Sequence, residues 1–363
     1  MRTIASSLLA ASAVTMLSAQ APATTFKLGT FERQGTSFVG VVLGGSVVID
    51  LAAADAAVMP ASGVATPRDM KDLIARYDKG VRSRILELIA RVNAAGASRP
   101  AWVVDLSSVK TLPPIMYPQT MLNVAVNYRE HALEMGGADT SPGGPGAALP
   151  GTKSAPGIWE RQAGDTRWNP YLFTKLPSAV IAAGEAIQLP VGRTQIDWEC
   201  ELGVVIGARA SRIGVERARD YIFGYTIEND VSDRAGRGDT RHGSDWLIAK
   251  SHDTFAPMGP FIVPKEFVAD PQKLKVTFTL NGQVMQDANT SLMIHTVFEQ
   301  VSYASHIITL HPGDVIATGS PAGVGAARTP PIFLKTGDLS ECTYEGIGTL
   351  RNPVAGALVT RSS

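Results

Sequence analysis

Cysteine, net charge and long apolar segments are all scarce in this chain of 363 residues. Its two cysteines, Cys200 and Cys342, are too few for a disulfide framework or a cysteine-rich zinc site, and we expect Cys200 to be a buried structural thiol. The formal net charge is zero and no basic stripe stands out, which argues against nucleic acid as a partner. After the N-terminal residues no segment approaches about eighteen uninterrupted apolar residues, so the mature chain should contain no membrane span.

Residues 1–21 have the pattern of a secretory signal peptide. Met1-Arg2 supplies a positive start, residues 4–17 are apolar, and residues 18–21 (SAQA) end in an A-x-A pattern. The apolar run is too short to span a membrane. We therefore expect this segment to be removed and the protein to be exported, to the periplasm or the medium. The alternative is a mis-started N-terminus on a cytoplasmic protein.

Residues 22–118 are predicted to form a small α+β domain. Strand-like apolar runs flank Gly44-Gly45, which is a hairpin signal. Residues 69–95 then place apolar side chains at mostly helical spacing, and Gly96 is a plausible end of the helix. Several prolines between residues 98 and 120 indicate a linker, so we place the domain boundary near residue 118.

Residues 119–363 make up the second predicted domain, in which short β-like segments dominate apart from one helix-like stretch at 292–306. Residues 136–169 are rich in glycine, proline, serine and aspartate and should form a long surface loop. Two interpretations of this loop stand side by side: a lid that orders over a substrate, or a passive insertion. The predicted fold class is α+β and rich in β-structure.

The acidic segment Asp197-Trp-Glu-Cys-Glu201 suggests a metal site on β-structure. In a strand, Asp197, Glu199 and Glu201 would share one face and the apolar residues between them the other. Carboxylates about 7 Å apart on one face repel each other, and a divalent cation reverses that balance. With Asp230 about thirty residues later, these oxygen donors favour Mg²⁺ or Mn²⁺ over zinc, while Ca²⁺ stays open. Taken alone, the segment also fits a solvated acidic strand face.

His131 and Glu134 are three residues apart in a segment predicted to enter a helix, so they share a face. A carboxylate in that position orients the imidazole as a general base and stabilises its charged form. A surface His/Glu pair is the plainer alternative. Residues 318–325 (TGSPAGVG) lack the Lys-Ser/Thr ending of a phosphate-binding loop, so a tight turn that lines the metal pocket is the better interpretation.

Six motifs, in order and at family-like spacing, resemble the fumarylacetoacetate hydrolase family over residues 121–355. The motifs are residues 127–135 (NYREHALEM), 173–175 (FTK), 197–202 (DWECEL), 229–232 (NDVS), 250–260 (KSHDTFAPMGP) and 318–325 (TGSPAGVG). The resemblance implies a mixed β-sandwich-like roll with few helices, usually homodimeric, that holds one Mg²⁺ or Mn²⁺ per active site.

Carried over position by position, the resemblance assigns ten residues to the site. The metal ligands would be Glu199, Glu201 and Asp230. The catalytic group would be His131, Glu134 and Lys250, with the first two as a water-activating dyad. The substrate contacts would be Lys175, Arg234, Thr318 and Gly319. Many relatives continue the Asp230 motif as Ser-Ala-Arg-Asp with a glutamine further on, whereas residues 232–235 (SDRA) keep the arginine, move the acid and lose the glutamine.

Chemistry on a 2-oxo acid follows from these parts, with a small oxo acid as the partner. We predict metal-dependent hydrolysis of a carbon–carbon bond in a 2,4-dioxo acid, because the His131–Glu134 dyad supplies activated water. The same site would also serve an oxo-acid decarboxylase or a 2-hydroxy-dienoate isomerase. A non-catalytic exported binding protein is a further alternative.

Overall fold

The computed structural model describes residues 24–59, 63–136, 155–160, 162–165, 167–236 and 243–357. Residues 1–21 and most of the long loop at 136–169 therefore lie outside the described part of the chain. The helices are α1 Leu51–Ala57, α2 Met70–Arg76, α3 Val81–Ala95, α4 Arg129–Gly136, α5 Ala218–Tyr221, α6 Trp246–Lys250 and α7 Val297–Ile307. No helix in the described ranges is both long and apolar enough to cross a membrane.

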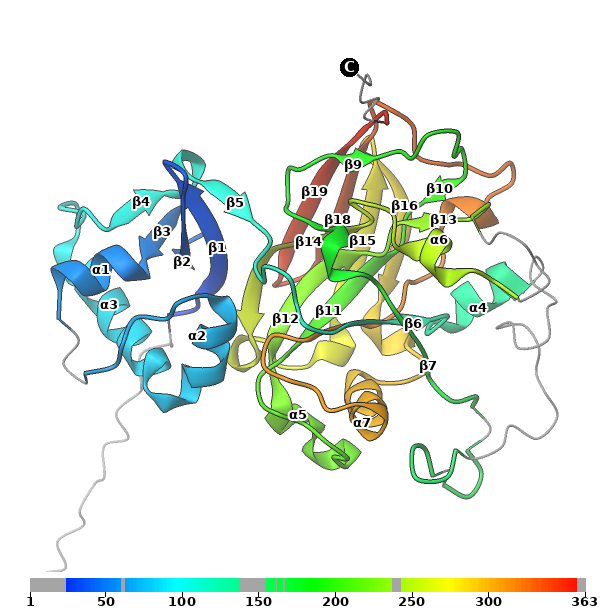
Figure 1. The fold of residues 1–363 in the computed structure, drawn as a ribbon, viewed down its shortest axis with the longest axis horizontal. Coiled ribbons are helices and arrows are strands. Elements are labelled where there is room, and N and C mark those ends of the chain that lie inside the picture. The colour runs from blue at the N-terminus through cyan, green and yellow to red at the C-terminus, as the bar shows by residue number, and fades with distance from the viewer. Residues whose placement is uncertain are drawn as a thin grey trace, which may run out of the picture.

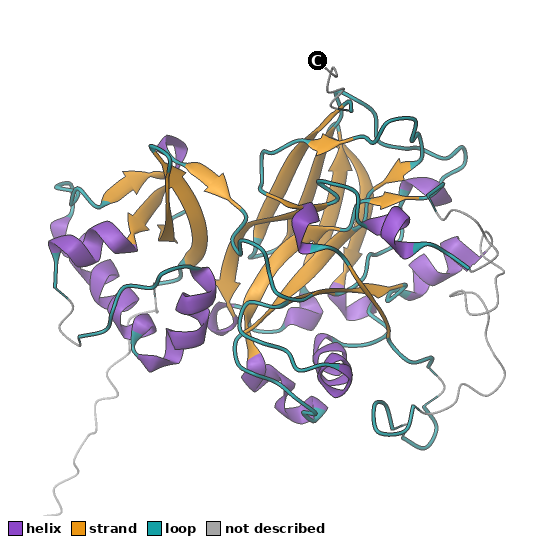
Figure 2. Ribbon diagram, in the orientation of Figure 1, coloured by secondary structure: helices purple, strands orange, loops and turns teal. Residues whose placement is uncertain are grey.

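The strands are short and numerous, as the sequence indicated (Figure 2). Those before residue 200 are β1 Lys27–Arg33, β2 Thr36–Leu43, β3 Val47–Asp50, β4 Val103–Asp105, β5 Lys110–Leu112, β6 Met121–Ala125, β7 Tyr171–Thr174, β8 Val180–Ile181, β9 Ile187–Gln188 and β10 Ile196–Asp197. The later ones are β11 Cys200–Ile206, β12 Ile222–Asn229, β13 Ser232–Asp233, β14 Ala256–Pro264, β15 Lys275–Leu280, β16 Gln283–Asn289, β17 Val315–Ala317, β18 Leu339–Tyr344 and β19 Gly348–Ala355. The predicted α+β, β-rich class is confirmed.

The N-terminal part forms as its sequence indicates, with one difference. The β2–β3 hairpin turns at Gly44 and Gly45, both at positive φ, where glycine has no steric penalty. The helical stretch at 69–95 is broken into α2 and α3 at Gly80, whose φ of 108° is incompatible with a continuous helix. Helical spacing alone did not reveal that break, because apolar side chains of both helices face the same core.

One large sheet runs through both predicted domains (Figure 1). Its strand order is β4-β3-β2-β1-β14-β12-β11-β17-β6-β7, and β1 joins the later part of the chain by pairing Leu28 with Ile262 of β14. The core under α2 and α3 also includes Phe223 of β12 and Met258 of β14. The large sheet therefore includes strands from both sides of the predicted boundary near residue 118.

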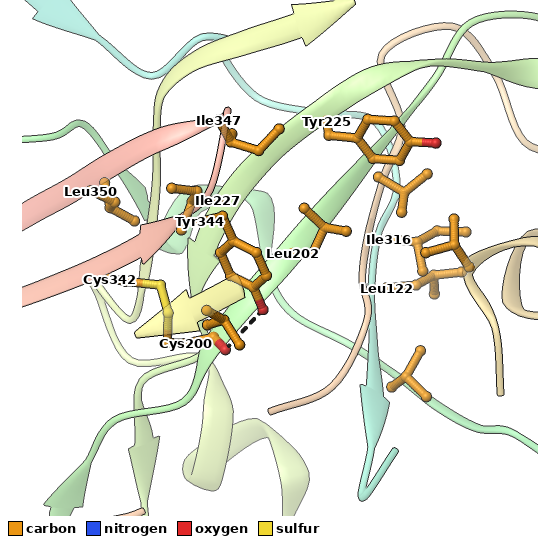
Figure 3. Packing of buried hydrophobic residues seen from close by; sticks show 14 of the residues in the cluster. Leu122, Cys200, Leu202, Tyr225, Ile227, Ile316, Cys342, Tyr344, Ile347 and Leu350 are labelled. Atoms are coloured by element: carbon orange, nitrogen blue, oxygen red, sulfur yellow. Dashed lines mark hydrogen bonds between the residues drawn. A yellow bond between two sulfur atoms is a disulfide. The ribbon is translucent and has the colours of Figure 1, made fainter. Parts of the chain in front are cut away.

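A second sheet, with the order β16-β15-β18-β19-β9, shares a hydrophobic core with the large sheet (Figure 3). Trp198 stacks on Phe278 of β15 with ring centroids 5.3 Å apart. The hydroxyl of Tyr344 in β18 donates to the carbonyl of Cys200 in β11. This sandwich buries the apolar side of the acidic segment, and thereby fixes where its carboxylates can point.

Cys200 is joined to Cys342 by a disulfide bond, so the expectation of a buried free thiol was wrong (Figure 3). The two cysteines are 142 residues apart in the sequence, and only the packing of β11 against β18 brings them together. The bond ties the acidic segment to the second sheet.

Removing this cross-link in the double variant Cys200→Ala/Cys342→Ala should lower the free energy of unfolding. Loop closure over the 142-residue separation predicts a loss of about 4–5 kcal/mol. Chemical denaturation with and without dithiothreitol measures the loss, and the variant should not respond to the reductant. Two titratable thiols in the unreduced, unfolded parent protein would contradict the bond.

The returning half of the long loop is anchored on α7. Arg167 donates to the carboxylate of Glu299 in α7 at 2.8 Å and to the carbonyl of Ile294 at 2.9 Å. Trp159 packs edge-on against His295, with ring centroids 5.5 Å apart. Residues 137–154, which make up most of the loop predicted as a lid or a passive insertion, lie outside the described residues.

His295 should make stability depend on pH below neutrality. Burial, and then the nearby Arg167, lower the pKa of its imidazole to about 4. The unfolded chain therefore binds a proton between about pH 6.5 and 4 that the folded chain does not, so stability falls as the pH falls through that window. The parent should lose about 2 kcal/mol between pH 7 and pH 5 that His295→Phe does not lose, measured by chemical denaturation. Parallel pH profiles would contradict this.

Candidate active site

Three carboxylates meet where β11 begins and β12 ends. Glu199, Glu201 and Asp230 are all buried, and one oxygen atom of each lies within 4.8 Å of the others. The antiparallel pairing of β11 with β12 places Cys200 opposite Asn229. The backbone N–H of Asp230 then donates to the carbonyl of Glu199 at 2.8 Å, which closes the turn after β12 over the acidic segment. The structure thus brings together the three residues predicted as metal ligands.

Asp197 does not join this group, although strand alternation placed it on the same face. The strand is interrupted between β10 and β11, so Asp197 lies on a different two-stranded sheet with β13. Its carboxylate turns instead toward the backbone of Gly325 and Ala326 and the guanidinium of Arg234. The regular alternation on which the prediction relied requires a continuous strand, and this one is broken.

Three cationic side chains in the described part of the chain contact the carboxylates. The ammonium of Lys250 in α6 lies between Glu199 and Asp230, 2.7 Å from the latter. Lys175, which follows β7, contacts Asp230 and donates to the carbonyl of Val231 at 2.9 Å. Arg234 donates to Glu199 at 2.7 Å. All three predicted cationic residues therefore reach the site.

Among the described residues, negative charge is still in excess in this buried site. The buried carboxylates are those of Asp197, Glu199, Glu201, Glu228 and Asp230, against Lys175, Lys250 and Arg234. Fully ionised, they outnumber the cations by two charges. That difference equals the charge of one divalent cation, which is the simplest way to neutralise a buried site of this kind.

The pKa values of the carboxylates show where charge is crowded. Burial, followed by Asp230 and Glu199, raises the pKa of Glu201 well above its usual range. Burial alone would also raise the pKa of Glu199, but Arg234 and Lys250 outweigh it and hold that pKa well below its usual range. Burial and Asp230 raise the pKa of Glu228 to about 8. Glu199 is therefore charged, while Glu201 and Glu228 favour protonation until a cation compensates them.

His131 lies between Glu134 and the carboxylate group. Its Nδ1 atom is 2.7 Å from Oε1 of Glu134, as expected for residues three apart on α4, and the imidazole is buried. Its Nε2 atom faces Oε1 of Glu199 at 3.8 Å. Nε2 therefore points toward the carboxylate oxygens. A water molecule or a substrate bound there could exchange a proton with it.

The loop at 318–326 is held to the site through its backbone. The N–H of Gly319 donates to Glu201 at 2.8 Å, and the N–H of Gly323 donates to Glu134 at 2.9 Å. A Cβ atom at Gly319 would meet Asn127 at 2.6 Å, so this approach requires glycine. The hydroxyl of Thr318 is buried and has no hydrogen-bond partner among the described residues, which leaves it available to a ligand.

Asp233, the acidic residue whose position differs from that in many relatives, forms contacts that hold residues 232–235 in place. The carboxylate of Asp233 pairs with Arg193 and accepts from the N–H of Ala235 at 3.0 Å, and His252 lies 3.5 Å away. Asp233 thus fastens the turn that carries Arg234. Arg234, which was predicted to bind substrate, forms ion pairs with Asp197 and Glu199.

Glu228 is the residue of this site to which the sequence assigned no role. It lies opposite Glu201 on β12, is completely buried, and accepts two hydrogen bonds from the amide of Asn123 at 3.0 and 3.2 Å. The sequence offered one indication of its role: Glu228 is two residues before Asp230, so in a strand the two side chains would share a face. This indication was weak, because the sequence alone does not show where β12 ends.

The donor set suits a hard divalent cation. Carboxylate oxygens are the ligands that Mg²⁺ and Mn²⁺ prefer. The excess of negative charge and the raised pKa of Glu201 both favour the binding of a cation among these oxygens. Glu199, Glu201 and Asp230 would hold it.

A family model described as fumarylacetoacetate (FAA) hydrolase, C-terminal, matches residues 120–355. The chain belongs to the fumarylacetoacetate hydrolase family. Oxaloacetate tautomerase YisK of Bacillus subtilis (strain 168) is 35% identical over 335 residues, which cover 90% of this chain and 99% of the relative. Mitochondrial oxaloacetate tautomerase FAHD2A of Bos taurus is 37% identical over 252 residues, 69% of this chain and 71% of its own.

Among solved structures, maleylpyruvate hydrolase from Sphingobium sp. SYK-6, in complex with manganese(II) ion and pyruvate, is 25% identical. It superposes with a TM-score of 0.64 over 91% of this chain and 99% of its own. Tautomerases and hydrolases thus both occur among these fumarylacetoacetate hydrolase family members, and the present chain is an enzyme of the family.

The prediction of export is wrong on these comparisons. The relatives from Xenopus laevis and Bos taurus are named as mitochondrial enzymes, and so act inside cells. Residues 1–21, on which the prediction rested, lie outside the described part of the chain.

Proposed function

We propose that this enzyme catalyses keto–enol tautomerisation of a short 2-oxo acid such as oxaloacetate, with one Mg²⁺ or Mn²⁺ as cofactor. The observation that carries the proposal is the place of His131, with a carboxylate at one ring nitrogen and a proposed metal ligand facing the other. A base next to a cation is what enolisation needs. The full-length similarity to an oxaloacetate tautomerase supports the substrate class.

The residues divide the reaction between them. A cation held by Glu199, Glu201 and Asp230 would polarise the keto oxygen and stabilise the negative charge that develops on it. In the keto-to-enol direction His131 Nε2 removes a proton from the carbon beside the keto group and delivers it to the oxygen; in the enol-to-keto direction it takes the proton of the enol hydroxyl and delivers it to that carbon. Glu134 holds Nδ1 and stabilises the charged imidazole. Lys175 and Lys250 place positive charge where the substrate carboxylate binds.

Hydrolysis of a 2,4-dioxo acid is the second candidate, and the same dyad favours it. Glu134 would orient His131 to take a proton from water, and that water would attack the second carbonyl carbon. The carbon–carbon bond then breaks, its electron pair forms the enolate of a pyruvate-type product, and the attacked carbonyl becomes a carboxylic acid.

Homodimeric assembly, which the family resemblance implied, is proposed for this chain as well.

A substrate panel separates the two reactions. The decay of enol-oxaloacetate and the release of pyruvate from acylpyruvates are measured with Mn²⁺ and with EDTA. We expect cation-dependent enol decay, accompanied by deuterium uptake from D₂O at the carbon beside the keto group. Pyruvate release without faster enol decay would favour the hydrolase, and cation-independent rates for both would contradict the proposed function.

A further inference from the structure

We propose that Asp197 is a positioning residue that holds the metal-binding Glu199 and the His131–Glu134 dyad in fixed relation to each other. It acts on Glu199 through Arg234 and on the dyad through the backbone at 323–326. The inference rests on the metal site proposed above, and it assigns Asp197 a part in the site although Asp197 lies outside the group of three carboxylates that meet there.

The carboxylate of Asp197 is saturated by structural donors. It has no exposed surface, and its Oδ1 atom accepts from the N–H of Trp198 at 2.8 Å and of Gly325 at 2.6 Å. Its Oδ2 atom accepts from the N–H of Ala326 at 3.0 Å and from Nε of Arg234 at 2.8 Å. A buried carboxylate with four donors is held rigidly, so it serves as a fixed point for the groups that contact it.

The first connection runs through Arg234. Nε of its guanidinium binds Asp197, and Nη2 binds Oε1 of Glu199 at 2.7 Å. The same Oε1 atom is the one that faces Nε2 of His131. A guanidinium is planar and offers its donors at fixed angles, so the position of Asp197 determines the position of this Glu199 oxygen.

The second connection runs through the loop. Gly325 and Ala326 donate to Asp197, and two residues before Gly325 the N–H of Gly323 donates to Glu134. A Cβ atom at Gly325 would overlap the carbonyl of Ile332 and lie 2.7 Å from Oδ1 of Asp197, so only glycine allows the backbone to approach the carboxylate this closely. Glu134 in turn holds Nδ1 of His131.

The two connections fix the two groups that face each other in the site: the first holds Oε1 of Glu199, and the second holds the imidazole of His131. Displacement of a reacting group by about 1 Å can lower turnover on the order of 10²-fold, so a residue that fixes both sides has a large effect without touching substrate. Loss of a residue that orients a metal ligand typically weakens metal binding by about 10–100-fold.

The test is Asp197→Asn, with Mn²⁺ affinity measured by calorimetry and kcat measured at saturating Mn²⁺. The asparagine amide offers one acceptor oxygen in place of two, so we expect Mn²⁺ to bind about 10–100-fold more weakly and kcat to fall on the order of 10²-fold. Asp314→Asn is the matched control, because Asp314 is also buried and accepts from the backbone of Thr120 and His311 outside the site. The control should leave both quantities within about threefold of the parent.

Arg234→Met tests whether Asp197 acts on Glu199 through Arg234. In that background Asp197→Asn should weaken Mn²⁺ binding by less than about threefold further, while kcat still falls, because the connection through the loop remains. If Asp197→Asn does not fold, Arg234→Lys tests the first connection, since one ammonium cannot reproduce both guanidinium contacts, and about 10-fold weaker Mn²⁺ binding is expected.

Equal behaviour of Asp197→Asn and Asp314→Asn, or unchanged Mn²⁺ binding by Arg234→Lys where the first variant is unfolded, would overturn the inference. A parent protein that does not bind Mn²⁺ at all would instead overturn the proposed metal site, so the two failures are distinguishable.

Discussion

Replacing Asp230 by asparagine should abolish the stabilisation of this protein by Mg²⁺ or Mn²⁺ while leaving its fold intact. Asp230 is one of three carboxylates whose oxygens lie within 4.8 Å of each other, and it is also the partner of Lys175 and Lys250. The parent should gain about 2.7 kcal/mol of unfolding free energy at a cation concentration about 100 times Kd, because the cation binds the folded state. The variant should gain almost none, and its metal-dependent activity should be lost.

Glu199→Gln should behave in the same way, whereas Glu228→Gln is the matched control. Glu228 is buried beside the site, but its carboxylate accepts from the amide of Asn123 and is not one of the three whose oxygens lie within 4.8 Å of one another. Glu228→Gln should therefore retain most of the cation-dependent stabilisation, measured as the shift in Tm with Mn²⁺. If Asp230→Asn responds to Mn²⁺ as the parent does, the ligands are misassigned.

Replacing His131 by alanine should lower turnover by about 10²–10⁴-fold, the usual contribution of a positioned general base. Metal affinity should change little, because Nε2 lies 3.8 Å from Glu199 and is not needed as a ligand. Tautomerisation and dioxo-acid hydrolysis should both suffer. Any decarboxylation of oxaloacetate should be largely spared, because loss of carbon dioxide needs neither activated water nor removal of a proton from carbon.

His252→Ala is a suitable control for that substitution. The Nε2 atom of His252 lies 3.5 Å from Asp233, and the side chain of His252 is partly exposed. Its removal should change turnover by less than about tenfold, well below the contribution of a general base. Equal losses of tautomerisation and decarboxylation in His131→Ala would show that His131 binds substrate rather than transfers protons.

Part of the candidate site could be proposed from the sequence because its members are close together in the chain. Glu199 and Glu201 are neighbours in one segment, and His131 with Glu134 lie one turn apart on one helix. Spacing alone also fitted a solvated acidic face and a surface His/Glu pair, and the resemblance to the fumarylacetoacetate hydrolase family decided between these interpretations. Asp197 could not be placed in the same way. Its direction depends on the break between β10 and β11 and on a loop more than a hundred residues later in the sequence.

The remaining differences also come from long-range packing. The disulfide between Cys200 and Cys342 needs two sheets to face each other, and nothing in either local sequence announces its partner. The continuity of the large sheet rests on the pairing of β1 with β14, which joins residues more than two hundred positions apart. Periodicity predicts strands and helices, but the order of strands in a sheet depends on which surfaces are buried together.

Anomalous diffraction from crystals grown with Mn²⁺ tests the proposed metal site directly. We expect one manganese peak per chain, bound by oxygens of Glu199, Glu201 and Asp230, with Lys250 no longer bridging Glu199 and Asp230. The same crystals of Asp230→Asn should lack the peak. A parent crystal without manganese at these three carboxylates, or with manganese bound elsewhere, would show that the metal ligands are misassigned.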